Sequence, residues 1–461
     1  MKELMKKLIG DKHFYKYVFA LVIPIMIQQG ITSFVSLLDN IMVGALGTEA
    51  ISAVSISNQI LLIFYLAIFG GVGAISIFSA QFYGKGDMEG MRFSFRAKIL
   101  FSLIISGIAL ALLLTFSPNF IALFLQGESN GGDLALTAEY AVNYIRIILI
   151  GFIPFTISQA YASTLRETGQ TFVPMLASVL AILVNLVFNW LLIYGNLGFP
   201  KWGVLGAAAA TSLSRYIEVV ILVVYTHARK KKYPFMKGLY RSLKVPLPLL
   251  KRIAVTGLPL LANEVLWAFG MTAQTQSFST RGLDVVAATN ISATTWNIFM
   301  IFMIAMGNAV QIIVGQHLGR GEIKKAREID TKLIFLTLVM NLGLGAILIA
   351  CSGAIPMLYN VPDSVRSLAA SLHVISGFIL PIESLVHVIY FTIRSGGRTL
   401  ITFLFDSVYT WVVPVQLAFC LCHFTVIPII TVYLIVQLAA VLKMIIGLLM
   451  LRSDFWARKI V

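Results

Sequence analysis

Four long segments of this 461-residue chain contain no Asp, Glu, Lys or Arg, at residues 51–84, 99–127, 285–319 and 333–362. Each exceeds the ~20 apolar residues that cross a bilayer as a helix. Because hydrocarbon offers the backbone no hydrogen-bond partner, a spanning segment must be a helix or a strand of a closed barrel. Barrel strands alternate polar and apolar residues over about ten positions, and these segments do not. The chain is therefore predicted to be an all-α integral membrane protein.

Composition supports a chain that lies largely within the membrane. Hydrophobic residues make up 58% of it and charged residues 12%, far from the usual balance of a globular protein. The hydropathy pattern predicts twelve transmembrane helices, with boundaries good to roughly three residues. They lie at residues 16–43, 51–82, 93–118, 135–162, 171–195, 203–226, 250–278, 285–315, 329–353, 365–392, 400–421 and 426–450.

The chain also repeats itself about 235 residues further on. Pro24 recurs as Pro259, and the run from Gln81 to Asp87 recurs from Gln316 to Glu322. The separation between matching positions then shortens by seven residues, and the repeat continues with Arg166, Gly169 and Thr171 matching Arg394, Gly397 and Thr399. Six helices per copy is an even number, so each copy begins and ends on the same side. We expect two parallel-repeat six-helix bundles, with a substrate site where they meet.

The distribution of basic residues predicts the orientation. With both termini in the cytosol, 29 of the 35 Lys and Arg residues fall on the cytosolic side, as the positive-inside rule requires. The net charge of +15 is therefore topogenic, and no nucleic-acid partner is expected. The predicted division is an N-terminal lobe at 1–228, a basic cytosolic linker at 229–247 and a C-terminal lobe at 248–461.

Several motifs in a fixed order resemble the multidrug and toxic compound extrusion (MATE) family. They are the runs Asp39–Gly47, Arg166–Pro174, Asn185–Asn189 and Gly203–Thr211, together with the duplicated Gln-x-x-Gly-x-Gly-Asp/Glu loop. The resemblance covers nearly the whole chain. It implies a V-shaped pair of six-helix lobes in the cell membrane, working as an antiporter. Such a protein expels organic, often cationic, compounds in exchange for inward Na⁺ or H⁺.

The same resemblance implies which partners to expect. They are a small organic substrate, membrane lipids and a coupling ion, Na⁺ or H⁺, with no cofactor, and we expect a monomer. The three cysteines form neither a disulfide framework nor a metal motif.

Asp39, Asn185, Asn189 and Thr211 are the candidate cation site of the first lobe. At a ~1.5 Å rise per residue, their positions on three predicted helices lie at similar depth. A carboxylate with amide and hydroxyl groups suits Na⁺ or a bound proton, and by resemblance these positions form the cation-responsive network. Many family members carry Asp at Asn189, so this site has one negative charge instead of two. The amides and hydroxyl also suit ordinary hydrogen bonding between helices.

Glu264 is the candidate coupling group of the second lobe. It lies about fourteen residues from either end of its helix, near the bilayer centre, where a carboxyl needs a partner or water. Na⁺ could bind at Asp39 or Glu264. Asp406, about two turns into the eleventh helix, is a further candidate for coupling.

A substrate cleft is expected to include four polar or aromatic residues: Gln28, Gln29, Asn263 and Trp267. Trp267 shares a face with Glu264, where its ring could stack on a flat cation. Packing against lipid or core is the alternative for this ring.

Positions that match between the two copies are predicted to have structural roles. Positions that differ are predicted to carry the chemistry of transport. Pro24 and Pro259 each remove one helical hydrogen bond and are predicted hinges, with static kinks as the alternative. Asp87 and Glu322 are predicted to cap the helices that follow them. In contrast, Asp39 aligns with Gln274 and Glu264 with Gln29, so each carboxylate has an amide as its counterpart.

Two other functions compete with the antiporter. A lipid-linked oligosaccharide flippase would need several cations in its cleft, and away from their ends the predicted helices offer only Arg146, Arg215 and Lys443. A membrane-embedded transferase would need a long external loop or a clustered His/Asp/Arg site. The longest external segment, about 118–134, contains neither.

Overall fold

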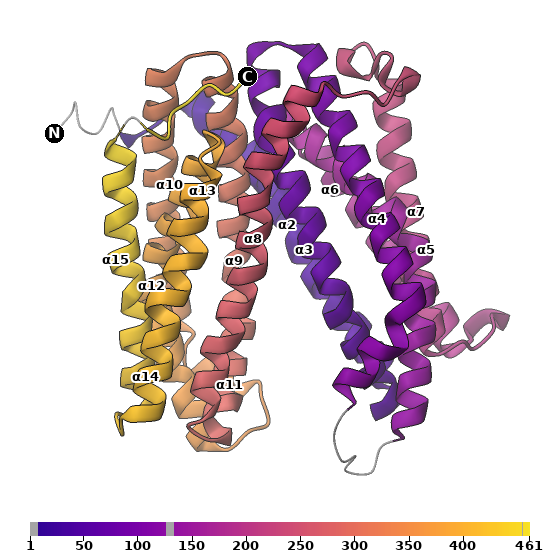
Figure 1. Cartoon of the computed structure of the whole chain (residues 1–461). Helices are drawn as coiled ribbons and strands as arrows, with labels where there is room; N and C mark the ends of the chain where they lie inside the picture. The colour runs from indigo at the N-terminus through magenta and orange to yellow at the C-terminus, as the bar shows by residue number, and fades with distance from the viewer. Residues whose placement is uncertain (1–7, 126–132, 454) are drawn as a thin grey trace. The chain divides into compact units, whose positions relative to one another are not determined.

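The computed structural model describes residues 8–125, 133–453 and 455–461. These residues form helices and connecting turns, with no strand (Figure 1). Twelve of the described helices are long and apolar enough to cross a membrane. The predicted all-α fold with twelve spans is therefore confirmed.

The spanning helices follow the predicted order. They are α2 (Lys12–Gly44), α3 (Thr48–Lys85), α4 (Met88–Phe124), α5 (Leu134–Glu167), α6 (Phe172–Tyr194), α7 (Val204–Ala228), α8 (Leu247–Ser279), α9 (Leu283–Gly319), α10 (Ile323–Ala350), α12 (Asp363–Ser395), the span Thr399–Phe424 and α15 (Ile429–Arg452). The span Thr399–Phe424 consists of α13 (Thr399–Phe403), two π-helical segments and α14 (Gln416–Phe424). A short helix, α11 (Ala354–Met357), precedes α12.

Some helix boundaries lie outside the predicted margin. Helix α4 begins at Met88 instead of residue 93, because Asp87 caps it by accepting a hydrogen bond from the Gly90 N–H. Helix α10 begins at Ile323 instead of residue 329. Hydropathy measures the part of a helix that lies in hydrocarbon, whereas backbone hydrogen bonds continue the helix into water.

The predicted cap at Glu322 is wrong. Glu322 precedes α10 but makes no side-chain cap. Its carboxylate is 2.6 Å from Nδ1 of His317 instead, and this hydrogen bond lowers the pKa of Glu322.

Contacts divide the chain into two compact units. Unit 1 comprises residues 1–22, 80–86 and 254–461, and unit 2 comprises residues 23–79 and 87–253. Unit 1 therefore includes the duplicated loop of the first copy together with most of the second copy. The predicted lobe and linker boundaries stay a prediction.

Unit 2 is built on α5 and α7. Helix α5 packs against α4 and α7, and α7 packs against α6. One apolar core of this unit includes Leu61 of α3, Ile145 of α5 and Ala208 of α7, all inaccessible to solvent. Nearby, the Lys98 ammonium lies 2.6 Å from the Glu167 carboxylate, and the Lys98 side chain is fully buried. The Ser163 and Thr164 hydroxyls complete the coordination of this ammonium.

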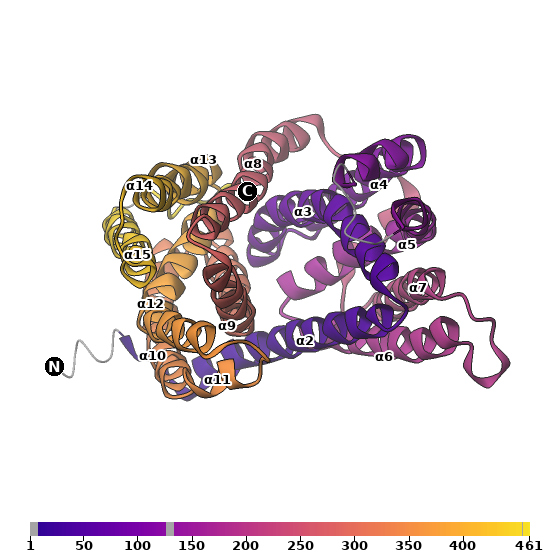
Figure 2. The same ribbon diagram turned by 90° about the horizontal axis from the view of Figure 1, so that it is seen from below.

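Unit 1 is organised around α12. This helix packs against α9, α10 and α15, and Figure 2 shows these three helices beside it. Its core joins Ala288 of α9 and Leu372 of α12 to Val432 of α15, all at 0% exposure. Because α12 has neighbours on several sides, most of its residues from Leu380 to Ser395 are buried.

The duplicated Gln-x-x-Gly loops contact each other within unit 1. A Cβ added to Gly84 would overlap the backbone of Gln316, and one added to Gly319 would overlap the backbone of Gln81. Each copy therefore supplies the glycine against which the glutamine backbone of the other copy packs. This reciprocal contact explains why the motif occurs twice, since only glycine permits so close an approach.

Gln81 also holds the C-terminal segment. Its amide donates to the carbonyls of Ser395 and Arg458, at 3.0 and 3.1 Å, and its oxygen accepts from the Ile460 N–H at 2.8 Å. In the same segment the Trp456 side chain is 1% exposed. Residues 455–461 are thus part of the packed structure of unit 1.

The glycine contact predicts that Gly319→Ala will destabilise the protein. The added methyl group must push backbone apart, which costs about 1–3 kcal/mol, and thermal unfolding of the detergent-solubilised protein measures the loss. Gly343→Ala is the matched control, because no atom lies within 4 Å of a Cβ there and alanine favours the helix. Equal unfolding midpoints for the two variants would contradict the proposed contact.

Candidate functional site

Asp39, Asn185, Asn189 and Thr211 lie together in unit 2, as their spacing predicts. The Asn189 amide donates to the Asp39 carboxylate at 2.5 Å. The Asn185 side chain satisfies its neighbours when its nitrogen faces Asp39 and its oxygen faces Thr211. In this orientation the nitrogen donates to the two Asp39 carboxylate oxygens at 3.2 and 3.3 Å. The oxygen then accepts from the Thr211 hydroxyl at 3.2 Å and the Thr211 N–H at 3.3 Å. Helices α2 and α6 thus meet at one carboxylate, and α7 joins the cluster through Asn185.

Two features distinguish this cluster from a closed structural network. Oδ1 of Asn189 is buried without a hydrogen-bond partner among the described residues. None of the ion pairs recorded in the described part of the chain includes Asp39. A carboxylate in a membrane-spanning helix normally has a cationic partner or water, and a buried orphan oxygen calls for an explanation. Both features fit a cluster that receives a cation.

Asp406 lies in a second polar cluster, in unit 1. Its Oδ1 is 2.8 Å from the Lys443 ammonium, and its Oδ2 accepts from the Asn263 amide at 2.9 Å. The Ser407 hydroxyl lies 2.8 Å from the Asn263 side-chain oxygen, and the Tyr390 hydroxyl 3.3 Å from its nitrogen. The side chains of Asp406 and Lys443 are 19% and 10% exposed. This carboxylate therefore already has a cation.

The local backbone at Asp406 is unusual. Asp406 belongs to a π-helical segment, Leu404–Val408, and a second one follows at Trp411–Val415. Isolated π-helical turns inside α-helices are rare and are often found at functional sites. Sequence reasoning predicted an ordinary helix here, since hydropathy does not distinguish π from α geometry.

Glu264 is half-buried in α8, next to Asn263 in sequence. No hydrogen bond or ion pair of its carboxylate is recorded within the described residues. Gln29 and Trp267 are also half-buried, and their predicted place in a substrate cleft is untested. Pro24 and Pro259 lie inside the continuous helices α2 and α8, and their hinge role stays a prediction.

Gln28 and Asn263, also predicted for the cleft, are both buried in polar clusters. The Gln28 amide donates to the Ser178 hydroxyl at 2.7 Å, and its oxygen accepts from Arg166 at 3.2 Å. Ser178 in turn donates to the Glu218 carboxylate at 2.6 Å. Sequence reasoning missed Ser178. Its signal was available, because the repeat aligns Ser178 with Asp406, just as it aligns Gln28 with Asn263.

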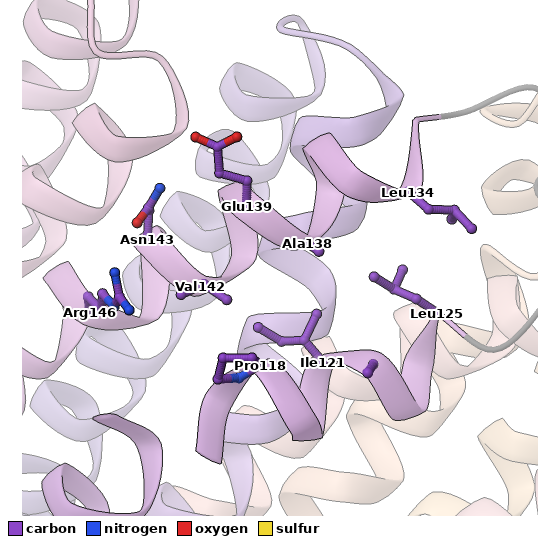
Figure 3. A pocket seen from close by; sticks show the side chains of 10 residues that line it. Pro118, Ile121, Leu125, Leu134, Ala138, Glu139, Val142, Asn143 and Arg146 are labelled. Atoms are coloured by element: carbon purple, nitrogen blue, oxygen red, sulfur yellow. The ribbon is translucent and has the colours of Figure 1, made fainter. Parts of the chain in front are cut away.

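A groove of about 470 Å³ lies between α4 and α5 (Figure 3). Pro118, Ile121 and Leu125 form its apolar side, and a polar stripe on α5 includes Glu139 and Arg146. None of the predicted coupling or cleft residues lines this groove. The chemistry described above is therefore located elsewhere, in small polar clusters between helices.

Comparison with known proteins decides the family. The MatE family model matches residues 24–191 and 259–420, one block in each copy. This chain belongs to the MATE family. MATE proteins are multidrug and toxic compound extrusion transporters, so the protein is a multi-pass membrane transporter of small molecules and not an enzyme.

Individual MATE relatives cover most of the chain. Probable multidrug resistance protein YoeA of Bacillus subtilis is 26% identical over 416 residues, which are 89% of this chain and 88% of that protein. Multidrug resistance protein MdtK of Photorhabdus laumondii is 27% identical over 354 residues, 77% of this chain and 76% of that protein.

Solved structures share the fold. A MOP superfamily transporter from Pyrococcus furiosus has a TM-score of 0.84 at 21% identity, over 97% of each chain. A multidrug resistance MATE family transporter in an outward-facing conformation has a TM-score of 0.85 at 20% identity, over 98% of each chain. At these identities the likeness concerns the fold alone.

The Asp39 cluster predicts that Asn189→Asp will strengthen the response to Na⁺. The change places a second carboxylate beside Asp39, and two such charges need a shared cation or proton. Added Na⁺ should raise the unfolding midpoint of the purified variant by roughly 2–4 °C more than that of the unmodified protein. Asn189→Leu removes the amide without adding charge and should show no such gain. A variant with two carboxylates that ignores Na⁺ would rule out a Na⁺ site here.

Proposed function

We propose that this MATE protein is a secondary active antiporter of the cell membrane. It exports organic, often cationic, compounds in exchange for inward Na⁺ or H⁺. The Asp39 cluster carries the proposal. Its carboxylate lies in a membrane-spanning helix, makes no close ion pair among the described residues, and is next to the orphan oxygen of Asn189. The names of relatives such as YoeA and MdtK support multidrug substrates.

Asp39 is proposed as the principal coupling group, with Asn185, Asn189 and Thr211 as its neutral ligands. When an inward-moving cation binds, the charge of Asp39 is neutralised and the cost of holding it in the membrane falls. A conformational equilibrium that depends on this charge is then shifted by the cation. Glu264 is proposed as a second coupling group, because it is half-buried and no hydrogen bond or close ion pair of its carboxylate is seen in the described part of the chain.

The contacts of the intramembrane cations favour an exporter over a lipid-linked oligosaccharide flippase. Lys443 is paired with Asp406 at 2.8 Å, and Arg215 lies 3.5 Å from Glu218. Lys98 is paired with Glu167 at 2.6 Å. Cations already neutralised by carboxylates are poorly placed to bind the pyrophosphate of such a lipid.

Efflux measured under separate gradients tests the function. Ethidium or norfloxacin efflux from loaded vesicles should respond to an imposed Na⁺ gradient, an imposed pH gradient or both. We expect Asp39→Asn to reduce gradient-driven efflux by roughly tenfold or more, since a coupling free energy of about 1.4 kcal/mol corresponds to that factor. We expect Glu264→Gln to reduce it as well.

Asp363→Asn is the matched control for the loss of a carboxylate. The Asp363 side chain is 95% exposed at the start of α12, so this variant should transport normally. Efflux that is indifferent to both gradients would refute the antiporter. Normal coupled efflux in both the Asp39 and Glu264 variants would refute the assignment of the coupling groups.

A further inference from the structure

Each unit contains a buried polar cluster at the same three places of the repeat. In unit 2 the cluster is Gln28, Ser178 and Glu218, and in unit 1 it is Asn263, Asp406 and Lys443. The repeat aligns Gln28 with Asn263 and Ser178 with Asp406. The third members also correspond, since each is the fifteenth residue of its helix, α7 or α15. We call these the first and second nodes.

The two nodes use different charges on one scaffold. In the first node the carboxylate is Glu218, at the position that Lys443 occupies in the second. Glu218 accepts from the Ser178 and Ser158 hydroxyls at 2.6 and 3.4 Å, and the Arg215 guanidinium lies 3.5 Å away. In the second node the carboxylate is Asp406, and the ammonium that neutralises it comes from the matching helix. Equivalent positions therefore hold charges of opposite sign.

The surroundings of Asp406 contain the ligands of a monovalent cation. Besides its own carboxylate there are the Asn263 side-chain oxygen and the hydroxyls of Ser407 and Tyr390, joined to one another by hydrogen bonds. This resembles the Asp39 cluster, which also combines a carboxylate with amides and a hydroxyl. Asp406 further lies in a π-helical segment, and irregular helical backbone commonly accompanies ion sites in transporters.

Lys443 occupies the position of a cation at Asp406. Its Nζ is 2.8 Å from Asp406 and lies 5.5 and 5.7 Å from the ring centroids of Phe405 and Tyr409. Aromatic faces attract an ammonium within about 6 Å, so the lysine is held on the carboxylate from several sides. Its flexible four-carbon chain nevertheless allows the charge to withdraw without rearranging the backbone.

We propose that Lys443 is a built-in cation that covers a latent Na⁺-type site at Asp406, beside the polar groups of Asn263, Ser407 and Tyr390. In the protein as it stands, the ammonium keeps Na⁺ from Asp406 because it already neutralises the carboxylate, while the Asn263 amide occupies the second oxygen. The second node is thereby neutral without ion uptake, whereas the Asp39 cluster of unit 2 takes its cation from solution. Removal of the ammonium exposes a cation site in unit 1.

Na⁺-dependent thermal unfolding of the full-length protein in detergent tests this inference. All variants carry Asp39→Asn and Glu264→Gln, which remove the two proposed coupling carboxylates, and choline chloride keeps the ionic strength constant. The protein with these two changes alone should show no Na⁺-specific shift. Addition of Lys443→Met should produce a rise of roughly 2–4 °C in the midpoint with Na⁺ at about ten times its dissociation constant.

Two control variants separate the latent site from a general loss of stability. Lys443→Arg keeps the positive charge and should not respond to Na⁺. Lys443→Met combined with Asp406→Asn removes the carboxylate as well, and should lose the response even if it is as stable as the single change. A shift of equal size in this combination would overturn the proposal, because the ion would then bind elsewhere.

A second route covers the case in which Lys443→Met does not fold. Lys443→Gln keeps a polar side chain of similar length and leaves Asp406 in place. This variant lacks the ammonium, so it should also gain a Na⁺-specific shift. Each of these variants that folds should show the Na⁺-specific shift of the unfolding midpoint. If no folded variant shows it, Lys443 does not cover a cation site. Because purified protein is measured, this outcome is independent of whether the protein exports drugs.

Discussion

The cost of holding charge in a membrane governs this structure. An uncompensated Lys, Arg or Asp at the centre of a spanning helix costs at least about 2.5–3.5 kcal/mol, so each one needs a partner. Lys98 meets Glu167, Lys443 meets Asp406 and Arg215 approaches Glu218. The Lys98–Glu167 and Lys443–Asp406 pairs also join helices to one another, so there neutralisation and packing are achieved by the same contacts. The Asp39 cluster stands out against this background, because its neighbours are neutral amides and a hydroxyl.

The duplication supplied one scaffold for two kinds of site. The shared elements are glycines, prolines and loop residues, and the reciprocal contacts of Gly84 and Gly319 with the opposite glutamine backbones show why they recur. Side chains within the scaffold were free to differ. The two nodes show this most clearly, because Ser178 and Asp406, at the same place of the repeat, are respectively neutral and charged. A transporter built this way can keep one mechanical frame while its halves handle cations differently.

Much of the Asp39 cluster could be predicted from sequence. A rise of ~1.5 Å per residue was enough to place Asp39, Asn185, Asn189 and Thr211 at one depth, and the structure brings them into contact. Lys443 was visible in the sequence as an intramembrane cation, but its partner was not. Asp406 and Lys443 are on different helices, and their distance depends on how those helices are rotated and packed. The π-helical segment that holds Asp406 was equally invisible, because a change of one residue in hydrogen-bond register leaves hydropathy unaltered.

The sequence by itself determined that the chain is a twelve-helix membrane protein, that it is a duplicate, and which family it belongs to. Those properties depend on long apolar segments and ordered motifs, which the bilayer and common descent impose on the chain directly. The tertiary structure alone decided which carboxylates are neutralised by the protein and which are not. That distinction is set within a few ångströms, because Coulomb energy and hydrogen bonding change steeply over that range. The sequence therefore supplied the charged groups, and the packing of the helices determined which of them remain available to a cation.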